Sequence, residues 1–477
     1  MNTQEVRQNA GQFALLPHQS AVVEAIFNPA TKRVLQLRGV AGLGKSTTLV
    51  AIAGRLLREQ PKGRVLFLAP AAIRTMYVEK FQDTGTPALL IDRYVFRELL
   101  DAKTDGELWS GGSVFILSRD FAKQPDILDT LVRAHWNLLI IDEAHWLKGS
   151  QAKNILTRID PSAERIVLAS ASDFDLSDVL SQQETQVIEW KRDDVVDRNG
   201  IPLTTVPAPL LHEFPFHLSQ PELNLGKAIV GVSSAIQLDA GPERSIPPML
   251  FRCIQSSPAA LEDMLTRLLT RSDAPDASES MEELREEDPE VDSIAKELHR
   301  GAADNVAAIA RRALDDLETI EIDSKLTAFD GLLSGLDEVQ APKRICILTE
   351  YIATLYYLAA EIESLGLPCV LLHSGMTNLD RQESLTAAIQ GQSILLATYA
   401  VAEGYNFGQV TDLILYDVAN NEARLRQALG RFDRIGRQSQ LNVHVLVPAG
   451  VTDAPMTPPI AVLRELFAER AGLQRNS

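Results

Sequence analysis

The chain has 477 residues, enough for about two or three domains, and its 45% hydrophobic and 23% charged residues are typical of a folded globular protein. The formal net charge of −18 argues against a generally basic nucleic-acid coat protein, although it leaves room for a locally basic cleft. No apolar run reaches the roughly 18 residues that span a bilayer, and the first residues lack a signal-peptide core, so we expect a cytoplasmic protein with no membrane contact. Cys253, Cys346 and Cys369 share no metal-ligand spacing, and we expect them to be reduced thiols.

Short apolar runs alternate with helical patterns in the first part of the chain. The runs are "RVLQL", "RVLFLAP", "SVFILS", "NLLIIDEAH" and "RIVLAS". Continuous apolar runs between helices are typical of parallel strands that are covered on both faces of a sheet. This part of the chain is therefore predicted to form a parallel sheet with helices on its two faces.

The alternation stops after about residue 185 and resumes at Arg344. Between them lie Pro-rich segments, helical patterns and an acidic stretch that we expect to be a solvated connector. The last part contains the runs "RICILTE", "CVLLHSG", "SILLAT", "DLILYD" and "NVHVLVPAG". The predicted domains are a polar tail (1–12), a first α/β lobe (13–212), a helical insertion (213–323) with the acidic connector at 272–290, a second α/β lobe (324–450), and a C-terminal helix and tail (451–477).

The segment "GVAGLGKST" follows the first apolar run, begins at Gly39 and fits the phosphate-loop pattern. Glycines let the backbone wrap a phosphate, whose charge then faces backbone N–H groups and a helix N-terminus. Lys45 is expected to reach the β- and γ-phosphates of ATP, and the Ser46 hydroxyl is expected to hold Mg²⁺. The residues expected to bind the nucleotide are Gly39, Gly42, Leu43, Gly44, Lys45, Ser46 and Thr47.

A pair of carboxylates, Asp142 and Glu143, follows the fourth apolar run. Ligands bind at the carboxyl ends of the strands in an open parallel sheet. We expect Asp142 to hold Mg²⁺, usually through water, and Glu143 to orient and deprotonate the attacking water. An isolated Asp-Glu pair is a weak signal, and its place after a phosphate loop in the same sheet makes it a strong one.

Two arginines, Arg431 and Arg434, lie three residues apart in "ALGRFDRIGRQ". If this segment is helical, both guanidinium groups leave the same face and can bind one anion. The pattern by itself fits equally well a surface pair that contacts water or a nearby carboxylate.

Taken in order, the motifs resemble those of superfamily-two helicases and translocases, specifically the Swi/Snf-type, DEAH-box branch. The resemblance covers about residues 14 to 450 and is greatest to compact bacterial members related to the RNA-polymerase recycling ATPase. The segments that carry it are "LLPHQSAVVEAI", "GLGKST", "FLAPAAIRTMYVEKF", "VFILSRDFAK", "DEAHWLKG", "VLASASDFDL", "LLATYAVAEGYNF" and "RLRQALGRFDRIGR". Two positions depart from the family pattern: Asp173 replaces a proline, and Arg437 replaces a glutamine.

The resemblance implies an α/β fold with two RecA-like parallel-sheet lobes joined by a mostly helical middle. It also implies that Gln19 reads the adenine, that Arg431 and Arg434 act as arginine fingers on the γ-phosphate, and that Gln427 lines the same site. Permanently charged, planar guanidinium groups suit the finger role.

Further residues are implied to couple ATP to nucleic acid. His145 is a candidate relay, and the alternative is a histidine that is satisfied at a strand end. Trp146 fits core packing better than base stacking. The remaining candidates are Ser170 and Ser172 for coupling and Ser118, Arg119, Thr398, Glu403 and Gly404 for contacts with the nucleic-acid backbone.

The resulting prediction is an ATPase that uses ATP and Mg²⁺ to translocate on nucleic acid and to remodel protein–DNA complexes. Double-stranded DNA is the preferred candidate for the nucleic acid. One alternative is a true strand-separating DNA or RNA helicase, and another is a nucleotide-gated module that switches a partner protein. Because backbone contacts carry no sequence information and the chain is acidic, we also expect a separate recruiting protein that docks on the helical middle or the C-terminal helix.

Overall fold

The structure, a computed structural model, is described in two units. Its contacts group residues 1–207, 403–408 and 429–437 into a first unit and the rest of the chain into a second unit. Each unit is taken by itself below. The described residues are 15–39, 42–102, 108–109, 112–148, 150–171, 176, 179–180, 184–191, 195–203, 208–240, 247–273, 303–337, 343–391, 393–402, 405–419, 422–434, 437, 439–450 and 459–470.

The first unit is built on a seven-stranded sheet in the order β3-β4-β2-β5-β6-β1-β7, and all of its strand pairs are parallel. The five predicted apolar runs form strands β1, β2, β4, β5 and β6. The edge strands β3 and β7 were not predicted, because both are partly exposed, β3 is only three residues long, and polar residues interrupt β7. The strands are β1 (Val34–Gly39), β2 (Val65–Ala69), β3 (Ala88–Leu90), β4 (Val114–Ser118), β5 (Leu138–Ile141), β6 (Ile166–Ser170) and β7 (Thr185–Trp190).

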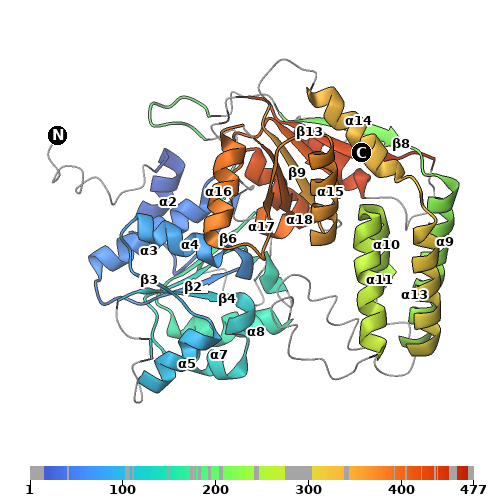
Figure 1. The fold of residues 1–477 in the computed structure, drawn as a ribbon. Helices are drawn as coiled ribbons and strands as arrows, with labels where there is room; N and C mark the ends of the chain where they lie inside the picture. The colour runs from blue at the N-terminus through green and yellow to red at the C-terminus, as the bar shows by residue number, and fades with distance from the viewer. Residues whose placement is uncertain are drawn as a thin grey trace, which may run out of the picture. The chain divides into compact units, whose positions relative to one another are not determined.

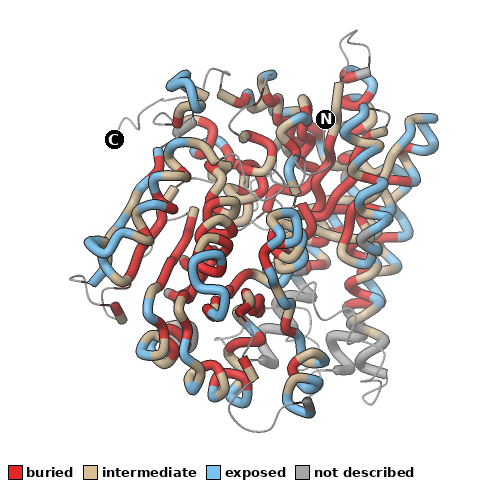
Figure 2. Tube along the Cα trace, turned by 90° about the vertical axis from the view of Figure 1, so that its left-hand side faces the viewer, coloured by how far each residue is buried: buried red, intermediate tan, exposed pale blue. Residues whose placement is uncertain are grey.

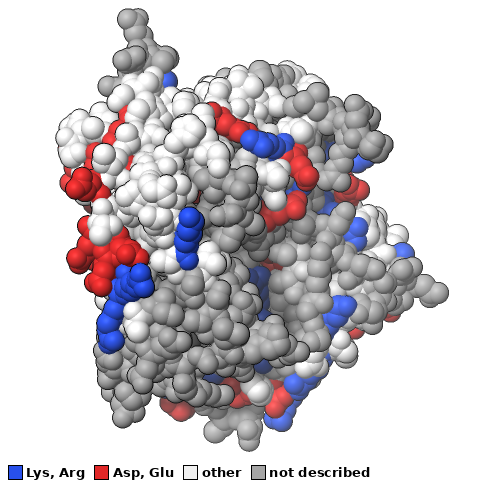
Figure 3. Space-filling model, turned by 90° about the vertical axis from the view of Figure 1, so that its right-hand side faces the viewer, with Lys and Arg blue, Asp and Glu red and all other residues white. Residues whose placement is uncertain are grey.

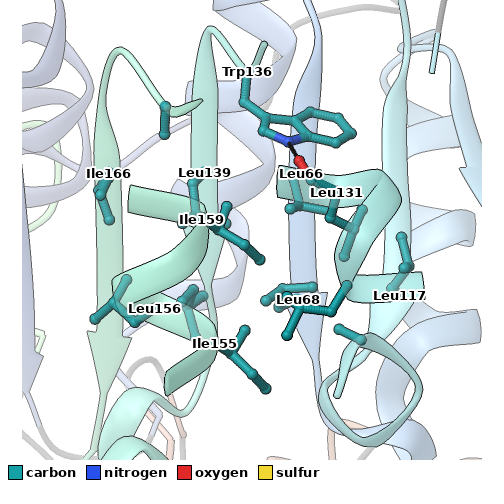
Figure 4. Packing of buried hydrophobic residues seen from close by; sticks show 14 of the residues in the cluster. Leu66, Leu68, Leu117, Leu131, Trp136, Leu139, Ile155, Leu156, Ile159 and Ile166 are labelled. Atoms are coloured by element: carbon teal, nitrogen blue, oxygen red, sulfur yellow. Dashed lines mark hydrogen bonds between the residues drawn. The ribbon is translucent and has the colours of Figure 1, made fainter. Parts of the chain in front are cut away.

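Helices cover both faces of this sheet (Figure 1). The face with α2 (Pro17–Phe27), α3 (Lys45–Glu59) and α4 (Arg74–Asp83) has one apolar core, and the face with α5 (Arg93–Ala102), α7 (Pro125–Arg133) and α8 (Ser150–Ile159) has another. Figure 4 shows the second core, where the indole of the fully buried Trp136 donates a hydrogen bond to Leu131 O at 2.9 Å. The sheet thus lies between two layers of helices, each with its own apolar core.

The second unit contains a six-stranded sheet in the order β10-β11-β9-β12-β13-β8, also with parallel pairs throughout. Its edge strand β8 precedes the helical middle in the chain and pairs with β13. We did not predict β8, since it is half exposed and includes Pro215, which only an edge strand accommodates easily. The strands are β8 (Leu210–Phe216), β9 (Ile345–Thr349), β10 (Cys369–Leu372), β11 (Ile394–Thr398), β12 (Asp412–Leu415) and β13 (Asn442–Pro448).

Two helices, α14 (Ser324–Asp337) and α15 (Ile352–Ser364), pack on this sheet and share its core. In Figure 2 the buried stretches follow the strands, and β11 is buried along its whole length. The other helices that follow strands in this unit are α16 (Asn378–Ile389), α17 (Tyr399–Ala402), α18 (Glu422–Phe432) and α19 (Ile460–Arg470).

The helical middle has a core of its own, built by α9 (Gln220–Ala240), α10 (Pro247–Ser256), α11 (Pro258–Asp273) and α13 (Ala303–Glu318). The helical stripe from Ala307 to Leu317 was expected to be a packing face, and Ala310, Ala313 and Leu317 are buried there. The predicted N-terminal tail and residues 274–290 of the acidic connector lie outside the described residues.

A buried ion pair fastens this helical middle to the second sheet. Lys325 Nζ lies 3.2 Å from Asp417 Oδ1 and also donates to the carbonyl oxygens of Gln255 (2.6 Å) and Ser256 (3.1 Å) at the end of α10. The Asp417 carboxylate accepts further hydrogen bonds from Ser256 Oγ and Thr349 Oγ1. Removing one member of such a pair leaves an uncompensated buried charge, so the contact holds the two parts together firmly.

The three cysteines are free, two of them fully buried. Within the described part of the chain, no helix is both long and apolar enough to cross a membrane.

Candidate active site

The phosphate loop leads from β1 into α3. Gly42 and Gly44 have φ angles of 90° and 85°, which L-residues rarely adopt, and a Cβ on Gly44 would lie 2.0 Å from Gln19 Nε2. Lys45 is the first residue of α3, and its buried Nζ donates to Gly39 O at 2.5 Å. Burial lowers the pKa of Lys45, while the charges of Glu143 and Asp142 oppose that shift. The loop therefore holds a desolvated ammonium group at the start of α3.

The start of α2 is joined to the phosphate loop by two neighbouring side chains. Gln19 accepts a hydrogen bond from Leu16 N at 2.9 Å and donates to Gly44 O at 3.4 Å. His18 contacts Leu43 O through Nε2 at 3.0 Å and packs edge-on against the Trp190 ring. Gln19 was predicted from the sequence, whereas His18 was not, because its partners are distant in the chain.

The carboxylate pair follows β5 at the carboxyl edge of the sheet. Asp142 Oδ1 accepts from Glu143 N at 3.0 Å, and Oδ2 accepts from the Tyr77 hydroxyl at 2.5 Å. Among the described non-glycine residues, Glu143 alone has a positive φ, 51°. Such strained backbone is concentrated at functional sites.

The two carboxylates differ in acidity. Burial and the neighbouring Glu143 charge raise the pKa of Asp142 to about 6. Burial also acts to raise the pKa of Glu143, but the hydrogen bond from His145 and the charge of Lys45 outweigh it and hold this pKa below its usual range. Glu143 is thus ionised more readily than Asp142.

His145 connects Glu143 to the end of β6. Its Nδ1 lies 3.4 Å from Glu143 Oε2 and 3.3 Å from Ser170 Oγ. The predicted role of His145, a relay between the nucleotide and the second lobe, stays a prediction. Ser172 of the same motif lies outside the described residues.

The arginine pair is not arranged as expected. We predicted that Arg431 and Arg434 leave one helical face, but α18 ends at Phe432 and Arg434 lies beyond it. The Asp433 N–H makes the last helical bond, to Leu429 O, and the Arg434 N–H bonds to Phe432 O instead, which ends the helix. Burial and the charge of Arg431 lower the pKa of Arg434 to about 10, so the two guanidinium groups still influence each other.

The segment 429–437 lies against the phosphate loop within the first unit. A Cβ on Gly42 would be 3.1 Å from Gly430 O and 3.2 Å from Asp433 O. Gln427 lies one helical turn before Arg431, in the part of α18 that groups with the second unit.

Arg437, which replaces the family glutamine, stabilises the end of α18. Its buried side chain donates from Nη1 to Phe432 O at 2.8 Å, and its own N–H contacts Arg434 O at 3.4 Å. Cations stabilise the free carbonyl groups at a helix C-terminus. The departure from the family pattern thus has a structural role in shaping the turn that carries Arg434.

Sequence reasoning missed Lys80 on α4. This half-buried side chain has its pKa lowered to about 8 by burial and by the charges of Arg434 and Arg431, with Asp142 opposing. Its ammonium group is therefore near the same set of charged residues. The only sequence signal is its spacing of three residues from the buried Tyr77, which puts both on one helical face.

The predicted nucleic-acid contacts fall into three groups. Ser118 is buried and caps α6 (Arg119–Ala122) by accepting from Phe121 N at 3.0 Å, and Thr398 is buried at the end of β11. Arg119 and Lys123 lie 5.9 Å and 5.3 Å from the ring of the partly buried Trp146, which packs against a core as expected. Glu403 and Gly404 lie outside the described residues.

The charges visible on one face do not form a continuous basic surface. In Figure 3 the described Lys and Arg side chains and the described Asp and Glu side chains occur in small interspersed groups. This fits the acidic balance of the chain.

Ser46 and Asp142 fit a magnesium site by their chemistry, since Mg²⁺ prefers hydroxyl and carboxylate oxygens and keeps several waters. No cluster of three or more His, Cys, Asp or Glu that could hold a metal occurs in the described ranges, so an all-protein metal cage is not found there.

Two protein families match parts of the chain: the helicase conserved C-terminal domain over residues 324–436, and an AAA domain over residues 14–173. The chain is 22% identical to the uncharacterized ATP-dependent helicase YqhH of Bacillus subtilis, over 91% of this chain and 75% of that protein. It is 23% identical to the RNA polymerase-associated protein RapA of Haemophilus influenzae, over 91% of this chain, and spans only 45% of that longer protein.

Among solved structures, a Saccharomyces cerevisiae Dbp5 variant bound to RNA and ADP with beryllium fluoride aligns with a TM-score of 0.50 and 12% identity. The alignment covers 96% of this chain and 88% of that one, and it concerns the fold alone. Two RecA-like lobes with parallel sheets are thus confirmed. In its domain matches and its relatives the chain is similar to ATP-dependent helicases and to RapA, which supports an ATPase of the helicase type.

Proposed function

We propose that this chain hydrolyses ATP to translocate along double-stranded DNA and to remodel protein–DNA complexes. The observation that carries the proposal is one set of charges within the first unit: Lys45 on the phosphate loop, the Asp142–Glu143 pair, and the Arg431–Arg434 segment against that loop. These are the parts that phosphoryl transfer requires, because catalysis there depends on positioning and on stabilising charge.

Each residue has a proposed role. Lys45 binds the β- and γ-phosphates, and Arg431 and Arg434 stabilise the charge that develops on the γ-phosphate. Glu143 orients the attacking water and accepts its proton. Ser46 and Asp142 would hold Mg²⁺, which supplies further positive charge on the phosphate oxygens when bound.

Coupling to the track is proposed to run through His145, which contacts both Glu143 and Ser170. A change at the motif that begins with Ser170 would alter the hydrogen bond that holds the Glu143 carboxylate. Gln19 is proposed to read adenine, and Gln427 to line the site.

The contact with DNA is proposed to use Arg119 and Lys123 beside Trp146, where cations and an aromatic ring gather. Such contacts bind phosphates and carry no base information. We therefore propose that a separate protein recruits the motor. RNA polymerase is a candidate, since relatives are named for their association with it.

The test is an ATPase assay with duplex DNA, single-stranded DNA, RNA and no nucleic acid in parallel. Duplex DNA should stimulate turnover most, without strand separation. Stimulation by single strands or RNA together with unwinding would favour the strand-separating alternative. A rate that no nucleic acid changes would favour the nucleotide-gated switch.

Recruitment is tested separately by affinity purification from the native host with nuclease present, so that DNA bridging is removed. A partner that is retained at moderate salt is the expected result. Recovery of the chain alone, together with strong duplex stimulation at physiological salt, would contradict recruitment.

A further inference from the structure

The hydroxyl of Tyr77 contacts one of the two residues that are proposed to hold the metal. Tyr77 is fully buried on α4, and its ring packs on Phe67 with the ring centroids 4.4 Å apart. Its hydroxyl donates to Asp142 Oδ2 at 2.5 Å. A buried phenol needs a partner, and the Asp142 carboxylate supplies it.

The direction of this hydrogen bond follows from the groups. The Asp142 carboxylate accepts, so the tyrosine proton points to it. Both oxygens of Asp142 are fixed, because Oδ1 accepts from Glu143 N at 3.0 Å.

We propose that Tyr77 is a positioning residue for the divalent cation at the ATP site. Its hydroxyl fixes the rotation of the Asp142 carboxylate. The inference rests on the proposed Mg²⁺–ATP function and goes beyond it by assigning a residue outside the phosphate loop and the carboxylate pair.

The competing explanation is that Tyr77 is an ordinary core residue whose hydroxyl happens to find a carboxylate. The two explanations differ in what loss of the hydroxyl changes. An outer residue that orients metal ligands typically changes metal affinity by about 10- to 100-fold. A core tyrosine changes stability and leaves metal affinity unaltered.

The test uses the full chain and the variant Tyr77→Phe, which keeps the ring and its packing on Phe67. Binding of Mn²⁺ in the presence of ADP is measured by the loss of the free-ion electron paramagnetic resonance signal. ADP affinity is measured in parallel with EDTA present. We expect Mn²⁺ affinity to fall at least 10-fold while metal-free ADP affinity stays within about twofold.

Two further variants make the result specific. Tyr357→Phe removes a comparable bond in the second unit, where the Tyr357 hydroxyl donates to Asp323 Oδ2 at 3.0 Å, and it should leave Mn²⁺ affinity unchanged. Ser46→Ala removes a proposed ligand and should weaken Mn²⁺ at least as much as Tyr77→Phe does. If Tyr77→Phe binds Mn²⁺ like the wild type, the inference is wrong; if the wild type itself binds no Mn²⁺ with ADP, the proposed function fails instead.

Discussion

Replacing Lys80 with methionine tests whether the charged cluster around the phosphate loop is built to receive an anion. Methionine keeps a long unbranched side chain and removes the charge. The pKa of Lys80 is lowered to about 8 because burial and two nearby arginines disfavour the ammonium form. A bound polyphosphate would favour that form, so nucleotide binding and protonation of Lys80 should support each other.

The magnitude follows from the size of the pKa shift. A full return from about 8 to the ordinary 10.5 corresponds to roughly 3 kcal/mol at about 1.4 kcal/mol per pH unit. Because Lys80 is only half-buried, solvent screening reduces this to about 1–2 kcal/mol. We therefore expect Lys80→Met to weaken nucleotide binding by roughly 5- to 30-fold at pH 7.

The expected dependence of nucleotide binding on pH follows from the direction of the Lys80 pKa shift. Lys80 in the free protein is charged below about pH 8, so the tighter nucleotide binding of the wild type relative to Lys80→Met is fully present there. As the pH rises above 8, binding must take up a proton, and the advantage declines toward zero. Titration of a fluorescent, non-hydrolysable ATP analogue from pH 7 to 9.5 measures it as the ratio of the two Kd values.

A control variant separates this effect from the effect of removing any one positive charge from the protein. Lys32 is exposed and donates to Thr185 O at the start of β7, so Lys32→Met should change the Kd by less than twofold at every pH. Equal affinities of Lys80→Met and the wild type at pH 7, or a ratio that stays constant up to pH 9.5, would refute the reasoning.

Three further predictions concern the site and the second unit. Lys45→Ala should weaken ATP binding and abolish turnover, and Glu143→Gln should bind ATP but not hydrolyse it, so wild-type hydrolysis by Glu143→Gln would contradict its assignment. Arg431→Ala or Arg434→Ala should keep ATP affinity within a few-fold and lower kcat by about 10³ or more. Full DNA-stimulated turnover of the double variant would show that both arginines are ordinary surface residues without a role in catalysis. Burial raises the pKa of Asp330 to about 6, so the free energy of unfolding falls as the pH rises from about 4 to 6. Because Asp330 is partly exposed, we expect Asp330→Asn to raise the free energy of unfolding at pH 7.5 by only about 1 kcal/mol. The melting temperature should rise by a few degrees at pH 7.5 and stay unchanged at pH 4.

The fold could be predicted wherever strands are buried on both faces. Such strands must be apolar throughout, so the five runs of the first sheet and the five of the second are visible in the sequence. The strands β3, β7 and β8 lie at sheet edges, where one face or one side meets solvent. Strand β3 is only three residues long, and polar residues interrupt the apolar residues of β7 and β8. Pro215 in β8 even argues against a strand as long as the neighbouring strand in the sheet is unknown.

The site could be predicted only where one segment supplies several of its residues. The phosphate loop and the Asp142–Glu143 pair are contiguous, so their spacing is informative. Tyr77 and Lys80 reach the same site from α4, and nothing local indicates which helical face turns toward the loop. The helical spacing of Arg431 and Arg434 was misleading, because the end of α18 at Phe432 depends on Arg437 and on bonds that a periodic pattern does not contain.

The two adjacent carboxylates explain why an Asp-Glu pair is informative only in this context. Two like charges on neighbouring residues in a buried place resist ionising together, and here their pKa values move apart, with Asp142 raised and Glu143 lowered. Carboxyl groups that are pushed apart in this way take different roles. Both can be ionised at neutral pH only where positive charge offsets their repulsion, and Lys45 supplies part of it. An exposed pair at an ordinary strand end has neither the burial nor the cations, and water alone keeps both of its carboxylates charged. The chemistry of the pair therefore comes from the lysine of the loop almost a hundred residues earlier, which the sequence shows, and from the burial around it, which only the fold supplies.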